Sequence, residues 1–133
     1  MKNLKIYAIL LVLAVAFSLN SCSSGTSAPG DAIVKAYDFM KNKEFEKAAK
    51  MYISAKGEKF TDAETKKMEG LAAMAYEQHK KKDGIKIVEI TEETIAEDGK
   101  SAKIKFTVHF NNGDTDNEKA DLLKIDGKWF IKV

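Results

Sequence analysis

The chain has 133 residues, with 22 basic and 20 acidic residues and a formal net charge of +2. Every basic residue is a lysine, and bidentate recognition of phosphates and guanine edges relies on arginine, so the composition argues against nucleic-acid binding. A single cysteine excludes a disulfide within the chain, and the length suits one compact domain.

The N-terminus has the three parts of a secretory signal peptide. Lys2 and Lys5 precede the uncharged residues 6–19, and small residues then lead to Cys22. A helix needs about 20 apolar residues to cross a membrane, so this run is too short to remain as an anchor. Removing residues 1–21 removes Lys2 and Lys5 and takes the formal net charge from +2 to zero. The positive net charge of the chain therefore comes from the signal peptide.

Leu19-Asn20-Ser21-Cys22 resembles the lipobox of bacterial lipoproteins, although Asn20 is a polar residue at the middle position. The resemblance implies cleavage before Cys22, thioether lipidation of its thiol and acylation of the new N-terminus, for example with palmitate, and the lipid bilayer as a partner. It also accounts for a lone thiol in an exported protein. The alternative is an ordinary secretory signal followed by a stray cysteine.

Residues 22–30 follow as the lipidated cysteine and a flexible tether of small, uncharged side chains. The tether lacks the acidic cluster that directs some Gram-negative lipoproteins to the cell surface. By this resemblance we expect a periplasm-facing position in the cell envelope, at the outer membrane. The folded domain is expected over residues 31–133.

Three helices are predicted in the first half of this domain. The first spans 31–41, and the second is capped by Asn42 and ends at Gly57, with Tyr52 on its apolar stripe. The third begins with a capping box formed by Thr61 and Glu64 and runs to about Lys82. Its apolar face carries Met68, Leu71, Ala72, Ala75, Tyr76 and His79.

After Asp83-Gly84 the apolar period changes from 3.6 to 2, which indicates strands. Hairpin signals at Asp98-Gly99, Asn111-Asn112-Gly113 and Asp126-Gly127 divide this half into four strands. The predicted class is therefore α+β, with three helices packed on one face of a curved, four-stranded antiparallel meander.

The predicted registers of the last three strands agree with one another. A two-residue turn at 126–127 pairs Lys124 with Trp129, Leu122 with Ile131 and Ala120 with Val133. A three-residue loop at 111–113, with Gly113 left-handed, sets the register of the two strands before the turn at 126–127. It pairs Ala102 with Leu122, Lys103 with Asp121, Ile104 with Ala120, Phe106 with Glu118 and Val108 with Asp116.

The first strand is ambiguous. Counting from 98–99 turns Ile85, Ile87 and Ile95 inward, together with Glu89, Thr91 and Glu93. We favour a β-bulge near Thr91 that shifts the register. The alternative is that these carboxylates line part of a cavity.

The order of elements and three short motifs resemble a known family. The motifs are residues 45–49 (Phe-Glu-Lys-Ala-Ala), 98–102 (Asp-Gly-Lys-Ser-Ala) and 126–129 (Asp-Gly-Lys-Trp). They resemble small bacterial lipoproteins with a lumazine-binding-like domain of unknown function, in the nuclear-transport-factor-two-like, cystatin-like superfamily. The resemblance implies a cone-shaped domain whose mouth lies between the helices and the concave sheet.

Residues on the inward stripes are candidates for lining a pocket in this cone. They are Tyr37, Met40, Tyr52, Met74, Tyr76, Phe106, Phe110 and Trp129, with Asp38 and Glu118 as a polar mouth. The simpler interpretation of each apolar one is hydrophobic core.

Catalytic chemistry has little support in the sequence. His79 is interpreted as a surface residue at a frayed helix end, and His109 as exposed on the outer face of the sheet. With these histidines and one cysteine, the sequence predicts no catalytic residues, no metal site and no cofactor.

We therefore expect a membrane-tethered, non-enzymatic module that binds a small apolar or aromatic ligand or an envelope protein. One alternative is an isomerase- or dehydratase-type enzyme that uses Asp38 or Glu118 as an acid in the cone. Another is a partner protein that docks through an outer patch of Val88, Ile90, Leu123 and Phe130, which requires the first strand to have no bulge.

Overall fold

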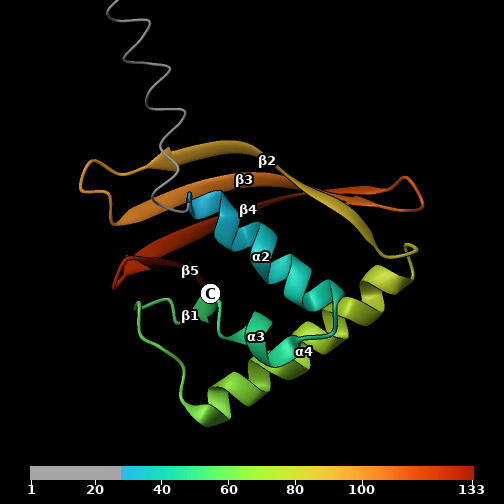
Figure 1. Ribbon diagram of the computed structural model, residues 1–133, viewed down its shortest axis with the longest axis horizontal. Coiled ribbons are helices and arrows are strands. Elements are labelled where there is room, and N and C mark those ends of the chain that lie inside the picture. Colours follow the sequence, from blue (N-terminus) through green and yellow to red (C-terminus); the bar gives the residue numbers. More distant parts are fainter. Residues whose placement is uncertain (1–27) are drawn as a thin grey trace, which may run out of the picture.

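The computed structural model describes residues 28–133 (Figure 1). The elements in chain order are helices α2 (Pro29–Lys41) and α3 (Phe45–Ala49), strand β1 (Tyr52–Ile53), helix α4 (Asp62–Lys80), and strands β2 (Ile85–Ile95), β3 (Ser101–Phe110), β4 (Thr115–Ile125) and β5 (Lys128–Lys132). The strands form one sheet in the order β1-β5-β4-β3-β2. The α+β class is confirmed, but the sheet has five strands and is mixed, because β1 is parallel to β5.

Helix α2 begins at Pro29, earlier than the predicted start at Asp31. Proline suits the first turn of a helix because its missing N–H would have no partner there. The Asp31 carboxylate accepts a hydrogen bond from the Ala28 N–H at 3.2 Å, which closes this turn. Pro29 and Gly30, which were assigned to the tether, are buried and belong to the domain.

The predicted second helix is much shorter than expected, and this accounts for the extra strand. Helix α3 ends at Ala49 instead of continuing to Gly57. The chain then extends, so that Ile131 N–H donates to Met51 O at 2.9 Å and Val133 N–H donates to Ile53 O at 3.1 Å. Ile53 becomes fully buried in this way. Pairing with β5 therefore overrides the helical periodicity that had placed Tyr52 on a helix.

The predicted register of β3 and β4 is confirmed. Ile104 pairs with Ala120 and Phe106 with Glu118, and Gly113 has a φ of 94°. In the last hairpin Leu122 pairs with Ile131, while Asp126 and Gly127 both have positive φ, as a type I′ turn requires. The predicted pair of Ala120 with Val133 does not form, because β5 ends at Lys132 and the Val133 N–H turns to β1.

Strand β2 contains the predicted bulge, since its register against β3 shifts between Ile90 and Glu92. A second shift lies between Ile85 and Ile87. Together they turn Val88 and Ile90 toward the core, where they pack against the buried cluster. The proposed outer patch of Val88, Ile90, Leu123 and Phe130 is therefore wrong.

The two shifts also separate the carboxylates of β2. Glu89 faces outward, where its Oε2 lies 2.8 Å from Nε2 of His109. Glu93 stays on the inner side, where its Oε1 accepts a hydrogen bond from the Gly30 N–H at 2.6 Å. It therefore ties β2 to the positive end of the α2 dipole. The alternative in which these carboxylates line a cavity together is wrong.

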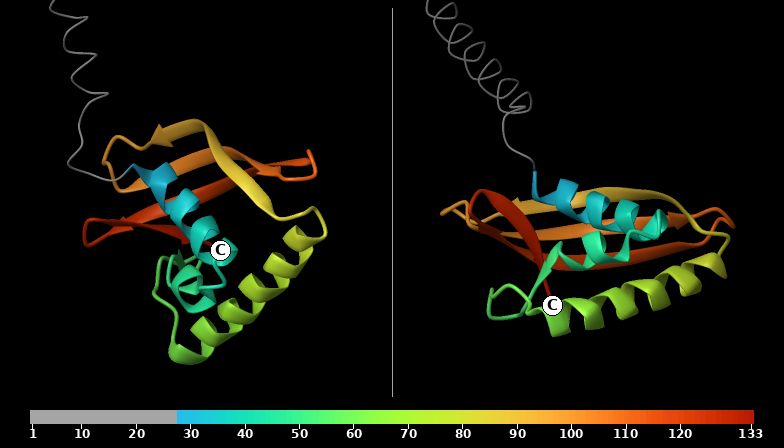
Figure 2. Two further views of the ribbon diagram at one scale, coloured as in Figure 1. Left: turned by 45° about the vertical axis from the view of Figure 1, so that its right-hand side comes forward. Right: turned by 60° about the horizontal axis from the view of Figure 1, so that its bottom comes forward.

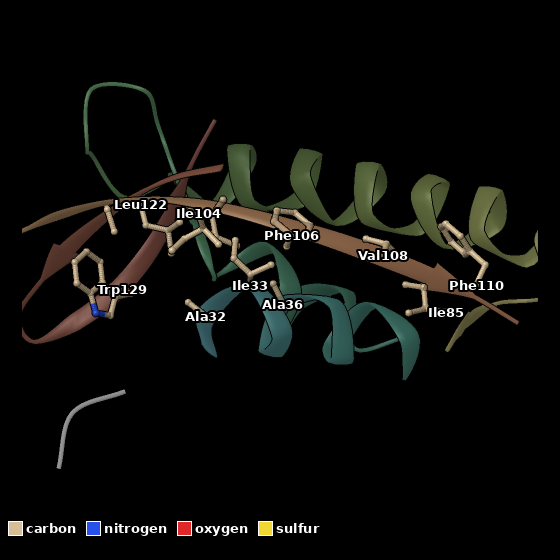
Figure 3. Packing of buried hydrophobic residues seen from close by; sticks show 12 residues of the cluster. Ala32, Ile33, Ala36, Ile85, Ile104, Phe106, Val108, Phe110, Leu122 and Trp129 are labelled. Atoms are coloured by element: carbon tan, nitrogen blue, oxygen red, sulfur yellow. The ribbon is translucent and has the colours of Figure 1, made fainter. Parts of the chain in front are cut away.

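The hydrophobic core lies between α2 and the inner face of the sheet (Figure 3). Ile33 and Ala36 of α2 contribute to it from the helix side. The sheet contributes the inward residues Ile85, Ala102, Ile104, Phe106, Val108, Phe110, Leu122, Trp129 and Ile131. The whole cluster lies between residues 32 and 131, so a chain of residues 23–133 retains it complete.

Helix α4 lies along the side of the domain, whereas α2 lies across the sheet (Figure 2). It starts as predicted, with Glu64 N–H bonded to Thr61 Oγ1 at 3.3 Å and Thr61 N–H bonded to Glu64 Oε2 at 2.8 Å. It packs mainly against α3 and contacts α2 less. Within α4, Ala72 alone is buried.

Candidate functional site

An apolar hollow lies between α4 and the rest of the domain. It has a volume of about 140 Å³, and we call it the α4 cleft. Its lining comes from α2, α3, β1 and α4 and consists of Met40, Ala49, Tyr52, Met68, Leu71, Ala72 and Ala75. No charged side chain is among them. The cleft is open because α4 packs mainly against α3, and the apolar residues of α4 beside this contact are not covered by another element.

That uncovered stripe consists of Leu71 and Met74, which are 51% and 65% exposed. They lie one helical turn apart on α4 and therefore on one side of it. Large apolar side chains are normally exposed singly, whereas here two neighbours adjoin an apolar hollow. Leu71 itself lines the cleft, and Met74 lies one helical turn beyond it, so exposed apolar surface continues from the cleft along α4.

A layer of aromatic rings lies where the C-terminal end of α4 approaches α2 and β3. Tyr37 contacts Phe106 edge to face, with ring centroids 5.7 Å apart, and stacks on His79 at 6.1 Å. The His79 ring in turn lies 5.5 Å from Phe110. Phe106 and Phe110 follow one another along the inner face of β3 (Figure 3). The rings therefore join α4, α2 and β3 at this end of the domain.

The two tyrosines between α4 and the sheet remain protonated phenols. Burial is the main cause that raises the pKa of Tyr37, and the nearby Tyr52, Glu118 and Asp116 raise it further. Burial also raises the pKa of Tyr52. Neither phenol can therefore act as a base near neutral pH, but each can donate a hydrogen bond.

His79 is held in this layer with one ring nitrogen unsatisfied. Its Nδ1 is buried and has no hydrogen-bond partner among residues 28–133. Burial lowers its pKa, the Lys82 ammonium lowers it further, and the Asp116 carboxylate opposes both. The earlier interpretation of His79 as a surface residue is wrong, because the helix end does not fray.

Lys82 fastens the C-terminal end of α4 to the sheet. Its Nζ lies 3.0 and 2.8 Å from the two carboxylate oxygens of Asp116 and 4.5 Å from the Phe110 ring centroid. The Gly84 N–H also donates to His79 O at 2.9 Å. The half-buried ion pair therefore keeps the last turn of α4 in place.

The predicted pocket residues do not form one pocket. Met40 and Tyr52 line the α4 cleft. Tyr37, Phe106 and Phe110 belong to the aromatic layer at His79, and Glu118 is exposed on β4. The others lie elsewhere. Met74 is exposed beside the cleft, Tyr76 packs on Phe45, Trp129 lies in the core near the start of α2, and Asp38 is exposed on α2.

Several cleft residues were not among the predicted pocket residues. Met68, Leu71, Ala72 and Ala75 were assigned only to the apolar face of the third helix. The width of that apolar face is a signal in the sequence that part of it stays uncovered. Leu71 and Met74 make the face wider than one neighbouring helix can cover. Ala49 gave no signal, because a small apolar residue is equally expected in any core.

Larger hollows lie elsewhere on the described part of the chain, but each is lined partly by charged groups. One of about 370 Å³ adjoins His79 and includes Lys41, Lys80 and Asp83. One of about 340 Å³ lies over β3 and β4 and includes Lys103, Asp121 and Lys132. We take the α4 cleft as the candidate site because its lining is apolar and adjoins exposed apolar side chains.

His109 lies on the outer face of the sheet, as predicted, and pairs with Glu89. Within residues 28–133, no three His, Cys, Asp or Glu side chains are grouped so as to hold a metal ion. The helices of this part also include none with the length and apolar character needed to cross a membrane.

Comparison with solved structures identifies the fold. A candidate NTF2-like transpeptidase from Campylobacter jejuni, known from a 2.00 Å crystal structure, is similar with a TM-score of 0.66 and 24% identity. The match covers 80% of this chain and 99% of that one. Aln2 from a Streptomyces species is more distant, with a TM-score of 0.44 and 16% identity over 77% of this chain and 81% of that one.

The first of these similarities supports an NTF2-like fold, the coarser part of the predicted resemblance. No curated protein matches the chain significantly. The sequence profile of a domain of unknown function, DUF4878, matches residues 22–132. This chain therefore belongs to the DUF4878 family.

Proposed function

We propose that this protein is a lipoprotein of the cell envelope whose domain binds a small apolar or aromatic molecule in the α4 cleft. The observation that carries the proposal is the continuous apolar surface formed by the cleft with Leu71 and Met74. Binding a ligand would remove this surface from water, and each Å² of apolar area buried contributes roughly 25 cal/mol.

The size and polarity of the cleft define the class of ligand. A dry cavity of about 150 Å³ can accept a benzene ring. The cleft is about this large, so it suits one aromatic ring or a short branched chain, with the remainder of the ligand lying along Leu71 and Met74. The Tyr52 phenol can donate one hydrogen bond. A charged ligand is disfavoured because no charged side chain lines the cleft.

The test uses the neutral fluorescent probe N-phenyl-1-naphthylamine and a chain of residues 23–133. We expect saturable binding with an increase in emission, and a loss of affinity of about tenfold or more in Leu71→Asp, because a carboxylate then enters an apolar site. Ile87→Asp is the matched control, since Ile87 is similarly exposed, at 57%, but lies on β2. Equal affinity of the two variants for the probe would contradict the proposal.

The membrane tether is proposed from Cys22 and the residues before it, which lie outside the described part of the chain. Palmitate labelling of the expressed precursor should be lost in Cys22→Ala, and the labelled protein should fractionate with the outer membrane. Proteolysis of intact cells should leave it intact if the domain faces the periplasm. Labelling that survives Cys22→Ala would contradict the assignment.

The enzymatic alternative has less support. Asp38 and Glu118, the carboxyls proposed for it, are both exposed, so neither has the apolar surroundings that suit a carboxyl acid in catalysis. Asp38 also lies on α2 away from the residues that line the cleft. We therefore retain a non-enzymatic binding module as the proposal.

A further inference from the structure

A further hollow lies at the opposite end of the sheet from His79, where α2 starts and β5 begins. It has a volume of about 400 Å³. We call it the lysine groove, and it is lined by Asp31, Ala32, Lys35, Lys50, Met51, Lys128, Trp129 and Phe130. Its lining therefore combines three lysines and one carboxylate with apolar residues, among which Trp129 is buried.

The charges of the lysine groove are only partly neutralised by neighbouring side chains. Among the described residues, Lys35 and Lys128 form no ion pair, while Lys50 pairs with Glu46 at 2.6 Å. The Asp31 carboxylate accepts a hydrogen bond from the Ala28 N–H but keeps its negative charge, so it offsets one of the three lysines that line the groove. An anionic group in the groove would therefore meet Lys128 and Lys35, of which the Lys35 ammonium also lies 5.7 Å from the Phe39 ring centroid, whereas a cation would meet a net positive lining.

The apolar part of the lining adds a second requirement on the ligand. Met51 and Phe130 are partly exposed and offer apolar surface, whereas Trp129 is 6% exposed and belongs to the core behind this lining. Lysines close to a membrane surface attract anionic lipids, with about 1 kcal/mol for each lysine. A ligand with an anionic head and an attached apolar part fits this lining better than a simple ion.

The groove also lies near the start of the domain. Figure 1 and the right view of Figure 2 place the beginning of α2 beside the turn between β4 and β5. The chain between Cys22 and Ala28 spans at most about 20 Å, at roughly 3.4 Å per residue. If Cys22 is acylated as proposed, this end of the domain is held within that distance of the membrane surface.

We propose that the lysine groove binds the phosphate group of an anionic phospholipid and so fixes how the domain sits on the membrane. This location rests on the proposed tether, but the binding does not require it. In this orientation the groove faces the bilayer, and the opposite end of the sheet, with Lys82 and Asp116, points away from it. The domain would then lie against the membrane instead of moving freely on its tether.

The test uses a chain of residues 23–133, which lacks Cys22, and measures the fraction of it that sediments with vesicles. Vesicles of phosphatidylcholine mixed with phosphatidylglycerol should be bound, and vesicles of phosphatidylcholine alone should not. Removing one lysine should weaken binding about fivefold, so the double variant Lys35→Gln/Lys128→Gln should lose about 25-fold. The control is Lys66→Gln/Lys67→Gln, which removes the same charge from exposed positions on α4.

Each outcome decides the proposal. A strong loss of vesicle binding in Lys35→Gln/Lys128→Gln, with little loss in the control variant, supports the proposal. Equal loss in both variants would show a non-specific charge effect, and no loss in either would show that the groove is not used. Titration with inorganic phosphate separates the two sources of the anion: saturation of the groove by phosphate, without vesicle binding, overturns the phospholipid assignment. Failure here leaves probe binding in the α4 cleft unaffected, so the two proposals can fail separately.

Discussion

Helices α2 and α4 both carry an apolar stripe, but they bury it to different extents. Helix α2 lies on the sheet and buries Ile33 to 1% and Ala36 to 0% exposure. Helix α4 rests on α3 and leaves Leu71 and Met74 about half or more exposed. The stability of the domain therefore comes mainly from the layer of α2 and the sheet, while incomplete packing along α4 leaves a surface available for binding.

The largest expected effect comes from deleting apolar volume in the first of these regions. Ile33→Ala should lower the free energy of unfolding by about 2–5 kcal/mol, since a fully buried side chain leaves a cavity between α2 and β3. Leu71→Ala should cost less than about 1 kcal/mol, because half of that side chain is already in water. Urea denaturation of both variants measures the difference, and equal losses would show that α4 packs as tightly as α2.

A glycine in each helix gives a sharper version of the comparison. A Cβ at Gly30 in α2 would lie 2.7 Å from Glu93 Oε1 and 3.0 Å from Ile90 Cγ1, so Gly30→Ala should destabilise by about 1–3 kcal/mol. A Cβ at Gly70 in α4 meets nothing within 4 Å, so Gly70→Ala should stabilise by about 0.5–1 kcal/mol through helix propensity.

If the packing is as described, thermal unfolding shows a lower melting temperature for Gly30→Ala and a higher one for Gly70→Ala. The same glycine-to-alanine change then has opposite effects on stability in the two helices. A loss of stability in Gly70→Ala would mean that α4 is covered in solution, by a second copy of the chain or by a closer approach of the sheet. The Gly30 variant also tests the hydrogen bond from its N–H to Glu93.

Much of the sheet could be predicted because short-range rules determine it. Alternation along β3 and β4, together with the left-handed Gly113 and the turn at 126–127, leaves few registers that bury Ile104, Phe106 and Leu122 together. The bulge near Thr91 could be inferred because the uniform register turned Glu89 and Glu93 inward. Local pattern and burial agree in these strands.

The remaining features depend on contacts that periodicity does not encode. Residues 45–53 have a helical pattern, yet residues 52–53 pair with β5 instead of continuing α3. This pairing buries the Ile53 side chain completely. The apolar face of α4 likewise predicts a helix without showing which neighbour covers it. The candidate site was therefore predicted only in part, since Met40 and Tyr52 were among the predicted pocket residues but Met68 and Leu71 depend on the position of α4.

The smallest expected effect concerns the point where the two regions meet, at His79. Its pKa is lowered in the folded state, mainly by burial, with Lys82, Asp116 and the Tyr37 phenol as its titratable neighbours. Below about pH 6.5, the ordinary pKa of histidine, the unfolded chain takes up a proton that the folded chain does not. Stability should therefore fall as the pH drops from there toward the folded pKa, and level off below it.

Subtracting the unfolding free energies of His79→Gln from those of the native chain, pH by pH, isolates this contribution. The difference should be constant above about pH 7 and decline on acidification. An NMR titration of the His79 ring gives the folded pKa directly and must agree with the pH at which the decline ends. A difference that stays flat, or that grows in favour of the native chain at low pH, would show that His79 is open to solvent and that α4 separates from Tyr37 and Phe110 in solution.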